Sequence, residues 1–312
     1  MTRLRGSYER IPGVKSCVVC VVAVVSVVVS LSVSPSAQTP RFKARTDAVT
    51  VTVTVSDSVG RIVTGLTKDD FEVFEDGKPE PITQFADGRV PVSMGVVLDS
   101  SDSMRGEAMA DARGAVDRFV GELLDGDDEA FVGMFNHVPW FVSGWKKPPA
   151  TLVRSLADKR PSGGTAIYDA LVAFVPMFEH RSNVRAAMVM ISDGADTASD
   201  RTLLQARDIL RRSDAFVYAV AIDAPDARPS TRVNPEALRE ITGPSGGYTE
   251  VVRTAADLGP ATARIADELN KQYTFAFESS RPPDGTWRNI RVHVTKGDYL
   301  ARGRRGYYAE RE

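Results

Sequence analysis

The stretch from Met94 to Leu98 is apolar throughout, and three side chains that carry oxygen atoms follow it at alternate positions, Asp99, Ser101 and Ser103. An unbroken apolar run of this length is typical of a strand that is buried on both faces. In an open α/β sheet, ligands bind outside the carboxyl ends of the strands, where these three side chains would lie. The stretch therefore predicts a central strand and one half of a divalent-cation site at its end.

Two later stretches can supply the other half of such a site. Ser162-Gly163-Gly164-Thr165 opens a predicted helix, and its glycines let the loop backbone approach an ion closely. A second apolar run begins at Met188 and ends in Ser192-Asp193-Gly194. Thr165 and Asp193 are therefore the further candidate ligands.

The five candidate side chains form a set that suits a hard cation. Asp99 and Asp193 would reach the same edge of the sheet, and two facing carboxylates repel each other unless a cation lies between them. With the hydroxyls of Ser101, Ser103 and Thr165 they provide the all-oxygen ligation that Mg²⁺ or Mn²⁺ prefers. Because hydroxyl ligands are neutral, such an ion keeps much of its charge and would accept an acidic group from outside. A single D-x-S-x-S could instead cap a helix, and only the combination with the later stretches favours a cation.

From Val92 onward the apolar pattern alternates between strands and amphipathic helices, which predicts a mostly parallel sheet covered on both faces. The predicted strands after the first are Ala130–Phe135, Trp140–Val142, Ala186–Ile191, Phe216–Ile222 and Tyr248–Val252. The predicted helices are Met104–Leu124, Ala166–His180, Leu203–Arg212, Pro235–Ile241 and Ala255–Tyr273.

Both ends of the folded part have a β pattern. Thr46 to Val55 alternates apolar and hydroxyl residues, and the segments 71–74 and 82–85 flank the hairpin signal Asp76-Gly77. The segments 274–277, 287–294 and 299–302 are also strand-like. We expect the strands of residues 41–89 and 273–312 to pack together as one β module, with residues 90–272 as an inserted domain. Separate small sheets at the two ends are the alternative.

Residues 1–37 have the pattern of a targeting segment. Basic residues precede an uncharged valine-rich core from Ser16 to Val33, and Ser34-Pro35-Ser36-Ala37 follows. A cleaved signal peptide is the favoured interpretation, and an uncleaved N-terminal anchor, the only expected membrane attachment, is the alternative. Both predict an exported protein that is secreted or periplasmic. The two cysteines, Cys17 and Cys20, lie in this segment, so the remainder has neither a disulfide nor a cysteine nucleophile.

Several polar residues outside the five were given simpler interpretations. Asp169 either hydrogen-bonds the metal loop or is a first-turn carboxylate that the helix dipole favours. Asp102 and Asp196 are interpreted as loop or capping residues. The histidines show no metal-ligand spacing and are interpreted as surface or loop residues, with only His137 expected near the site: His137, His180 and His293.

Two further groups could form contact surfaces. The three aromatic residues Trp140, Phe141 and Trp145 are interpreted as packing on edge strands rather than as a lip for a partner. The arginines near the C-terminal end are interpreted as a solvated strand edge: Arg302, Arg304 and Arg305.

At this point the sequence resembles a known family. Asp99-Ser100-Ser101-Asp102-Ser103-Met104, Gly164-Thr165 and Ser192-Asp193-Gly194 are similar to the three parts of the metal-ion-dependent adhesion site of von Willebrand factor type A domains. The resemblance covers residues 90–272, and the flanks LTKDDFEVFEDGKPEPITQF and RGRRGYYA resemble a bacterial exported group of such proteins. It implies a doubly wound, Rossmann-like sheet and a protein partner whose Asp or Glu completes the coordination of the ion.

The sequence offers little support for other functions. The formal net charge is −2 at pH 7, so no basic surface for nucleic acid is expected. No lysine follows Gly163-Gly164-Thr165 as a phosphate-binding loop requires, and no G-x-G-x-x-G follows a strand. We therefore expect a binding protein for adhesion or complex assembly, with no catalytic residues. A hydrolase in which an ion at Asp99 and Asp193 activates water is the alternative. The oligomeric state is not predicted.

Overall fold

The computed structural model describes residues 48–147, 160–223 and 232–310. The predicted targeting segment, with its cleavage site and the anchor alternative, lies outside these residues. Among the described helices, none is long and apolar enough to cross a membrane.

The central domain is built on a six-stranded sheet in the order β10-β9-β8-β5-β6-β7. Its strands are β5 (Val92–Asp99), β6 (Glu129–Phe135), β7 (Pro139–Lys146), β8 (Arg185–Ser192), β9 (Phe216–Ile222) and β10 (Thr249–Val252). All neighbouring pairs are parallel except β6 and β7. Strand β5 lies between β6 and β8, so the chain adds strands on both sides of it. Every residue of β5 and β8 is buried, as their apolar runs predict.

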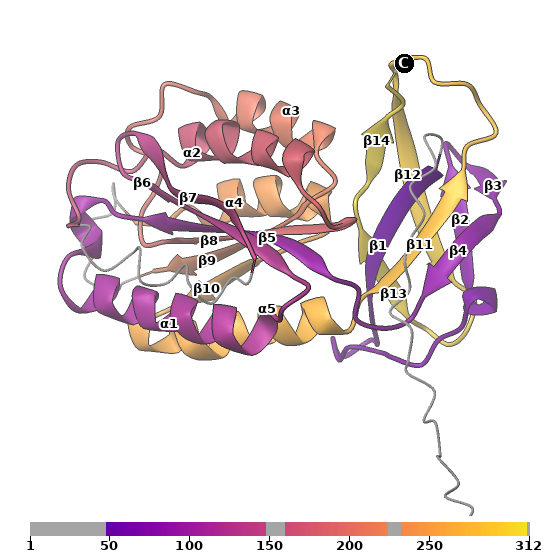
Figure 1. Cartoon of the computed structure of the whole chain (residues 1–312), viewed down its shortest axis with the longest axis horizontal. Helices are drawn as coiled ribbons and strands as arrows, with labels where there is room; N and C mark the ends of the chain where they lie inside the picture. The colour runs from indigo at the N-terminus through magenta and orange to yellow at the C-terminus, as the bar shows by residue number, and fades with distance from the viewer. Residues whose placement is uncertain (1–47, 148–159, 224–231, 311–312) are drawn as a thin grey trace, which may run out of the picture. The chain divides into compact units, whose positions relative to one another are not determined.

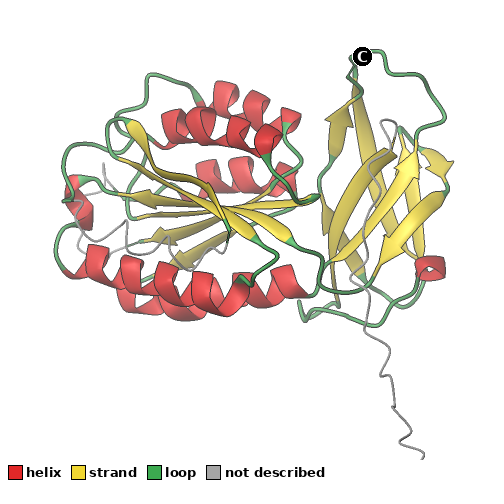
Figure 2. Ribbon diagram, in the orientation of Figure 1, coloured by secondary structure: helices red, strands yellow, loops and turns green. Residues whose placement is uncertain are grey.

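Five α-helices cover the two faces of this sheet in the described residues (Figures 1 and 2). They are α1 (Glu107–Leu123), α2 (Ile167–Phe174), α3 (Leu203–Arg212), α4 (Pro235–Thr242) and α5 (Leu258–Asn270). Apolar side chains of α1 and α5 form one core with the sheet, whereas those of α2, α3 and α4 form a second core on the opposite face. The prediction of a doubly wound, mostly parallel sheet is confirmed.

Three predicted helices differ in detail from the structure, for local reasons. The predicted helix Ala255–Tyr273 begins with a 3-10 turn over Ala255–Asp257 and ends at Asn270, and Tyr273 instead begins the strand Tyr273–Glu278. The predicted helix Ala166–His180 is α-helical only to Phe174 and continues as a 3-10 helix over Val175–His180. Pro176 lacks a backbone N–H and cannot extend the α-helical ladder. The predicted helix from Met104 begins instead at Glu107, because Gly106 precedes it with a φ of 74°.

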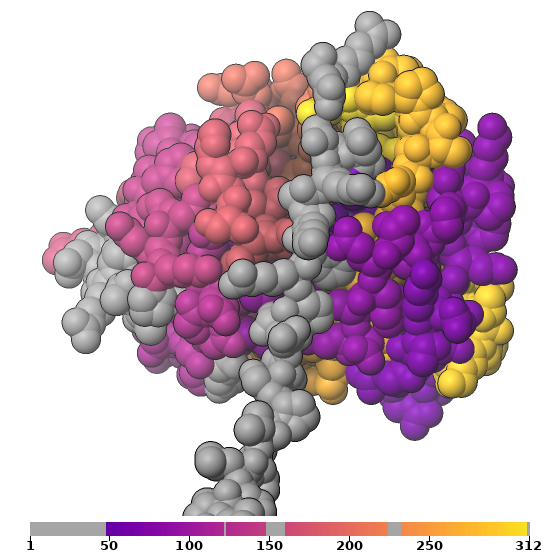
Figure 3. Space-filling model, turned by 45° about the vertical axis from the view of Figure 1, so that its right-hand side comes forward, coloured from indigo at the N-terminus to yellow at the C-terminus, as the bar shows by residue number. Residues whose placement is uncertain are grey.

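The β module contains two four-stranded sheets, in the orders β13-β1-β11-β4 and β14-β12-β2-β3. From the N-terminal side come β1 (Ala48–Ser56), β2 (Phe71–Glu75), β3 (Lys78–Glu80) and β4 (Ile82–Ala86). From the C-terminal side come β11 (Tyr273–Glu278), β12 (Trp287–Val294), β13 (Leu300–Gly303) and β14 (Gly306–Tyr308). Each sheet thus contains strands from both ends of the chain, and the indigo and yellow segments lie against each other in Figure 3.

The hairpin signal at Asp76-Gly77 formed a turn, but not between the two segments that flank it in the prediction. Asp76 and Gly77 have positive φ values of 46° and 83° and connect β2 to the short strand β3. Strand β4 pairs with β11 in the other sheet. Pro81 carries no N–H for the ladder and ends β3, so the chain leaves the sheet of β2 and β3 before β4 begins.

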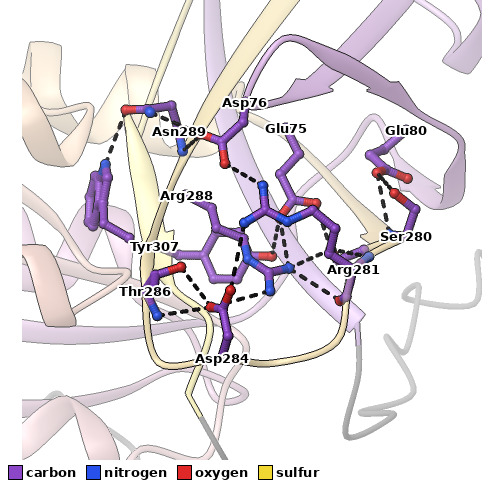
Figure 4. Close-up of polar contacts among 12 residues, drawn as sticks. Glu75, Asp76, Glu80, Ser280, Arg281, Asp284, Thr286, Arg288, Asn289 and Tyr307 are labelled. Atoms are coloured by element: carbon purple, nitrogen blue, oxygen red, sulfur yellow. Dashed lines mark hydrogen bonds and ion pairs between the residues drawn. The ribbon is translucent and has the colours of Figure 1, made fainter.

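A buried ion pair joins the strands of one sheet in the β module (Figure 4). The side chains of Arg288 and Glu75 are each 1% exposed, and Arg288 Nη1 donates to Glu75 Oε1 at 2.9 Å. Tyr307 Oη donates to the same oxygen at 3.0 Å, and Ser279 Oγ donates to Glu75 Oε2 at 2.6 Å. Because the carboxylate has three partners, its burial is compensated, and the cluster ties β2, β12 and β14 together.

The interpretation of the C-terminal arginines as a solvated edge is wrong for Arg302 and Arg304. Arg302 Nη2 donates to Glu268 Oε2 at 2.5 Å, and Arg304 Nη2 donates to the carbonyl of Thr50 at 2.6 Å. Both side chains are half-buried, and only Arg305 is exposed. The partners lie 34 and 254 residues away in the chain, so no local pattern could reveal them.

Glu268 is the acceptor that joins α5 and β9 of the central domain to the β module. It is 5% exposed and accepts hydrogen bonds from Thr54 Oγ1 at 3.0 Å and Tyr218 Oη at 2.9 Å, besides the one from Arg302. Gln272 Nε2 donates to the same threonine and tyrosine at 3.2 Å. Three donors from different elements therefore converge on this one carboxylate.

We expect Glu268→Ala to lower the free energy of unfolding by about 3 kcal/mol, because it leaves Arg302 Nη2 and the Tyr218 hydroxyl without the acceptor they share. Urea denaturation followed by circular dichroism measures this change. Glu179→Ala, at an exposed position whose side chain has no hydrogen-bonded or ion-paired partner among the described residues, is the matched control and should change the value by less than about 0.5 kcal/mol. Equal losses in both variants would contradict the role given to Glu268.

Candidate divalent-cation site

The parallel register of β5 and β8 places the two candidate carboxylates at one edge of the sheet. Leu98 in β5 is paired with Ile191 in β8, so Asp99 and Ser192 end neighbouring strands and Asp193 follows directly. The loop that carries Thr165 precedes α2 and meets the same edge. Backbone hydrogen bonds from Asp102 N to the carbonyl of Gly163 and from Ser162 N to that of Ser100, both 2.9 Å, hold it against the loop after β5.

Asp99 is fully buried and has only neutral hydrogen-bond donors. Ser192 Oγ donates to its Oδ2 at 2.6 Å, and the backbone N–H of Ser101 donates to its Oδ1 at 2.8 Å. Burial raises the pKa of this carboxyl to about 7, and the nearby charge of Asp193 adds to the rise. Within the described residues no arginine or lysine pairs with it, so a cation from solution would relieve its burial.

The other carboxylate is linked to the two serine hydroxyls. The Oγ atoms of Ser101 and Ser103 lie 3.0 Å apart, and Ser103 Oγ donates to Asp193 Oδ1 at 2.7 Å. Burial raises the pKa of Asp193, and the hydrogen bond from Ser103 partly offsets the rise. The structure thus connects Ser101, Ser103 and Asp193 directly, and Asp99 through the backbone of Ser101.

Thr165 is placed beside this group by the surrounding loops rather than by a side-chain contact to the other four. It is 4% exposed, and its N–H donates to Thr197 Oγ1 at 3.1 Å. Its carbonyl accepts from Thr197 N at 2.8 Å and Ala198 N at 3.0 Å, in the segment after β8. Its loop is therefore fixed on one side by the segment after β5 and on the other by the segment after β8.

Two supporting residues in this region were not identified from the sequence, Ser192 as a donor to Asp99 and Asn136 as a brace. The carbonyl of Asn136 accepts from Ala166 N at 2.7 Å, and its Nδ2 donates to Ser162 Oγ at 3.2 Å. Ser192 stands next to Asp193 in the predicted motif, so its position was a usable signal. The sequence contains no signal for the role of Asn136, because its partners lie in a loop far along the chain.

His137 lies against the loop that carries Thr165. Gly163 in that loop has a φ of 78°, and a Cβ added to it would lie 2.5 Å from His137 Nδ1. A side chain at position 163 would therefore be strained and would also collide with the imidazole.

The additional acids support the surrounding loops. Asp169 lies in the first turn of α2 and accepts from Asp200 N at 3.0 Å and Arg201 N at 2.8 Å, so it holds the segment before α3. Asp196 accepts from Ser199 Oγ at 2.6 Å and from Tyr168 N at 3.1 Å. Asp102 forms an exposed ion pair with Arg105 at 2.5 Å.

The donor set fits a hard divalent cation. The described residues contain no cluster of three or more His, Cys, Asp or Glu side chains that could hold a metal ion. A cation here would accordingly rely on hydroxyl oxygens in addition to two carboxylates, a set suited to Mg²⁺ or Mn²⁺. The same set is unsuited to a soft metal, which prefers thiolate or imidazole ligands.

Comparison with known proteins identifies the central domain. The family model for the von Willebrand factor type A domain matches residues 94–195. A von Willebrand factor type A protein from Catenulispora acidiphila is similar in structure, with a TM-score of 0.52 and 13% identity over 77% of this chain and 73% of its own. Proximal thread matrix protein 1 from the mussel byssus gives 0.51 and 15% identity over 68% and 50%. No curated protein matches the sequence. The central domain therefore has the von Willebrand factor type A fold.

We expect saturating Mg²⁺ or Mn²⁺ to raise the melting temperature of the protein, because a ligand that binds only the folded state stabilises it. Differential scanning fluorimetry with and without EDTA measures the shift. The shift should disappear in Asp99→Ala and persist in Asp102→Ala, whose carboxylate is outside the hydrogen-bonded group. A similar shift in wild type and Asp99→Ala would show that the cation acts elsewhere.

We expect the metal-free protein to lose stability as the pH rises from about 4 to about 7. Below this range Asp99 is protonated in both the folded and the unfolded chain. Within the range only the unfolded chain releases the proton, so the group costs about 1.4 kcal/mol per pH unit, and above it the cost is constant. Urea denaturation in EDTA at several pH values measures this slope. Asp99→Asn should flatten it, and an unchanged slope would refute the assignment.

Proposed function

We propose that this von Willebrand factor type A domain binds a protein partner through a divalent cation. Asp99, Ser101, Ser103, Thr165 and Asp193 would hold the ion, Mg²⁺ or Mn²⁺, and an Asp or Glu of the partner would complete its coordination. The observation that carries the proposal is the buried Asp99 carboxylate beside the hydrogen-bonded group Ser101, Ser103 and Asp193, at the carboxyl edge of β5 and β8.

The chemistry of the five residues favours binding of an acidic group. Three of the side-chain ligands would be neutral hydroxyls, so two carboxylates at most balance the charge of the ion. Neutral hydroxyls add no negative charge around the ion. The ion therefore attracts a further anion more strongly than it would if these ligands were carboxylates. A carboxylate from a partner is a ligand of the same hard type as Asp99 and Asp193 and would therefore be accepted readily. The resulting role is adhesion or complex assembly.

No observation favours the alternative of a metal-assisted hydrolase, in which the ion would activate water. The sequence contains one G-x-S-x-G pattern, Gly243 to Gly247, which in hydrolases can carry a serine nucleophile. Here Ser245 is buried, and its Oγ donates to the carbonyl of Thr242 at 2.6 Å and accepts from Val217 N at 2.9 Å. These bonds give the hydroxyl a structural role in the turn before β10.

We also propose that the folded part acts outside the cytoplasm. The support is the pattern of residues 1–37, with its basic start, valine-rich core and small-residue end. Both cysteines lie within this segment, so the described part of the chain needs neither a reducing nor an oxidising compartment.

Partner capture tests the proposed function. Wild-type protein immobilised in Mg²⁺ should retain a partner from the exported fraction of its own cells, and EDTA should release it without turnover. Asp99→Ala and Ser103→Ala should lose at least about tenfold in retained partner, because each removes a ligand. Asp102→Ala is the matched control and should retain it. Release of a cleaved product from the wild type alone would favour the hydrolase, and retention that survives EDTA would contradict the cation bridge.

A further inference from the structure

A cavity of about 600 Å³ opens at the carboxyl edge of the sheet, the edge that also carries the candidate cation site. Ala195 lines it, and this residue is the second one after Asp193. The opposite wall comes from the start of α4, with Asn234, Glu236 and Arg239, and Val251 of the edge strand β10 closes it. All these segments follow or end strands at the carboxyl edge of the sheet. A chain bound at the cation could therefore extend into this cavity.

One arginine that lines the cavity has a side chain without a partner among the described residues. Arg232 also lines it, but its Nε donates to Asp223 Oδ1 at 2.9 Å, so its charge is already balanced. Arg239 is exposed, and its side chain forms no hydrogen bond or ion pair within the residues that the structure describes. Glu236 lies one helical turn before it and forms no ion pair with it. The guanidinium of Arg239 is thus available for a carboxylate, which it can bind through two parallel hydrogen bonds.

A second cavity at the same edge differs in charge. It has a volume of about 380 Å³ and lies between α2, α3 and the start of β7. Its charged lining residues are Asp169, Asp200 and Arg201, two acids and one base. The first cavity has Glu236 and Arg239, which balance each other, besides Arg232, whose charge Asp223 balances, so it is neutral whereas the second cavity has one negative charge in excess. An acidic chain would therefore be directed to the side of Arg239 and away from the side of Asp169.

We propose that the partner carries a second acidic side chain, which Arg239 binds while the first reaches the cation. This inference rests on the proposed function and specifies the partner as an acidic protein segment with two carboxylates. The apolar stem of the second side chain would contact Val251, which is 36% exposed at the mouth of the cavity. Arg239 is then a determinant of specificity, because the cation alone accepts any single carboxylate.

The test uses a fluorescein-labelled decamer of aspartate as the probe and fluorescence anisotropy in Mg²⁺ as the measurement. Arg239→Gln should weaken binding of this probe about tenfold, as expected for the loss of a charged hydrogen-bonded pair. Arg201→Gln is the matched control, since it removes an exposed arginine from the other cavity, and should change the affinity less than about twofold. A Gly/Ser decamer with one aspartate should bind wild type and Arg239→Gln equally.

The outcomes separate this inference from the proposed function. Mg²⁺-dependent binding of the aspartate decamer that is unchanged in Arg239→Gln, or reduced equally in Arg201→Gln, overturns the role of Arg239 and leaves the cation bridge standing. Binding that persists in EDTA and in Asp99→Ala overturns the cation bridge itself. Absence of any binding to wild-type protein that takes up Mg²⁺ overturns the inference about an acidic segment.

Discussion

The burial of Asp99 at the end of β5 is the constraint on which the rest of the site depends. A carboxylate without exposure and without a cationic partner is costly, and the fold tolerates it only through hydrogen bonds from Ser192 and the backbone of Ser101. The parallel register with β8 then brings Asp193 to the same edge. The two acids, with the two serine hydroxyls that are linked to one of them by hydrogen bonds, are the basis on which a cation site is proposed at this edge.

The loops at this edge of the sheet are held in fixed positions, because four segments from different parts of the chain are hydrogen-bonded to one another there. The loop after β5 is bonded to the loop before α2, and that loop is bonded in turn to the segment after β8 and to Asn136. Thr165 needs no side-chain contact to the other candidate ligands to be held in position. Such a braced site requires little rearrangement when it takes a ligand, which lowers the cost of binding.

The far end of the central domain is held by a different kind of interaction. Glu268 of α5, Tyr218 of β9 and Arg302 of β13 form a buried polar group with Thr54 and Gln272. This group joins elements that begin more than 200 residues apart in the chain. Because a buried carboxylate tolerates only well-placed donors, the group specifies how the strands of the β module meet α5 and β9.

The sequence by itself determined the fold class and the identity of the central strands. Apolar runs such as those of β5 and β8 can be buried only in a covered parallel sheet, and helices such as α3 show their apolar face in their periodicity. Because these signals are local, a covered, mostly parallel sheet and the edge that carries Asp99 and Asp193 could be predicted, whereas the von Willebrand factor type A family was implied only by the resemblance of the three motifs.

Only the tertiary structure decided which distant residues meet. The pairing of β4 with β11 instead of β2, the burial of Arg302 against Glu268, and the support of Ser162 by Asn136 all join positions far apart in the chain. The meeting of Ala195, Arg239 and Val251 around one cavity belongs to the same class. Periodicity and local motifs predict which helix or strand a residue belongs to. They do not predict its distant contacts, because these depend on where the packed helices and strands bring their side chains.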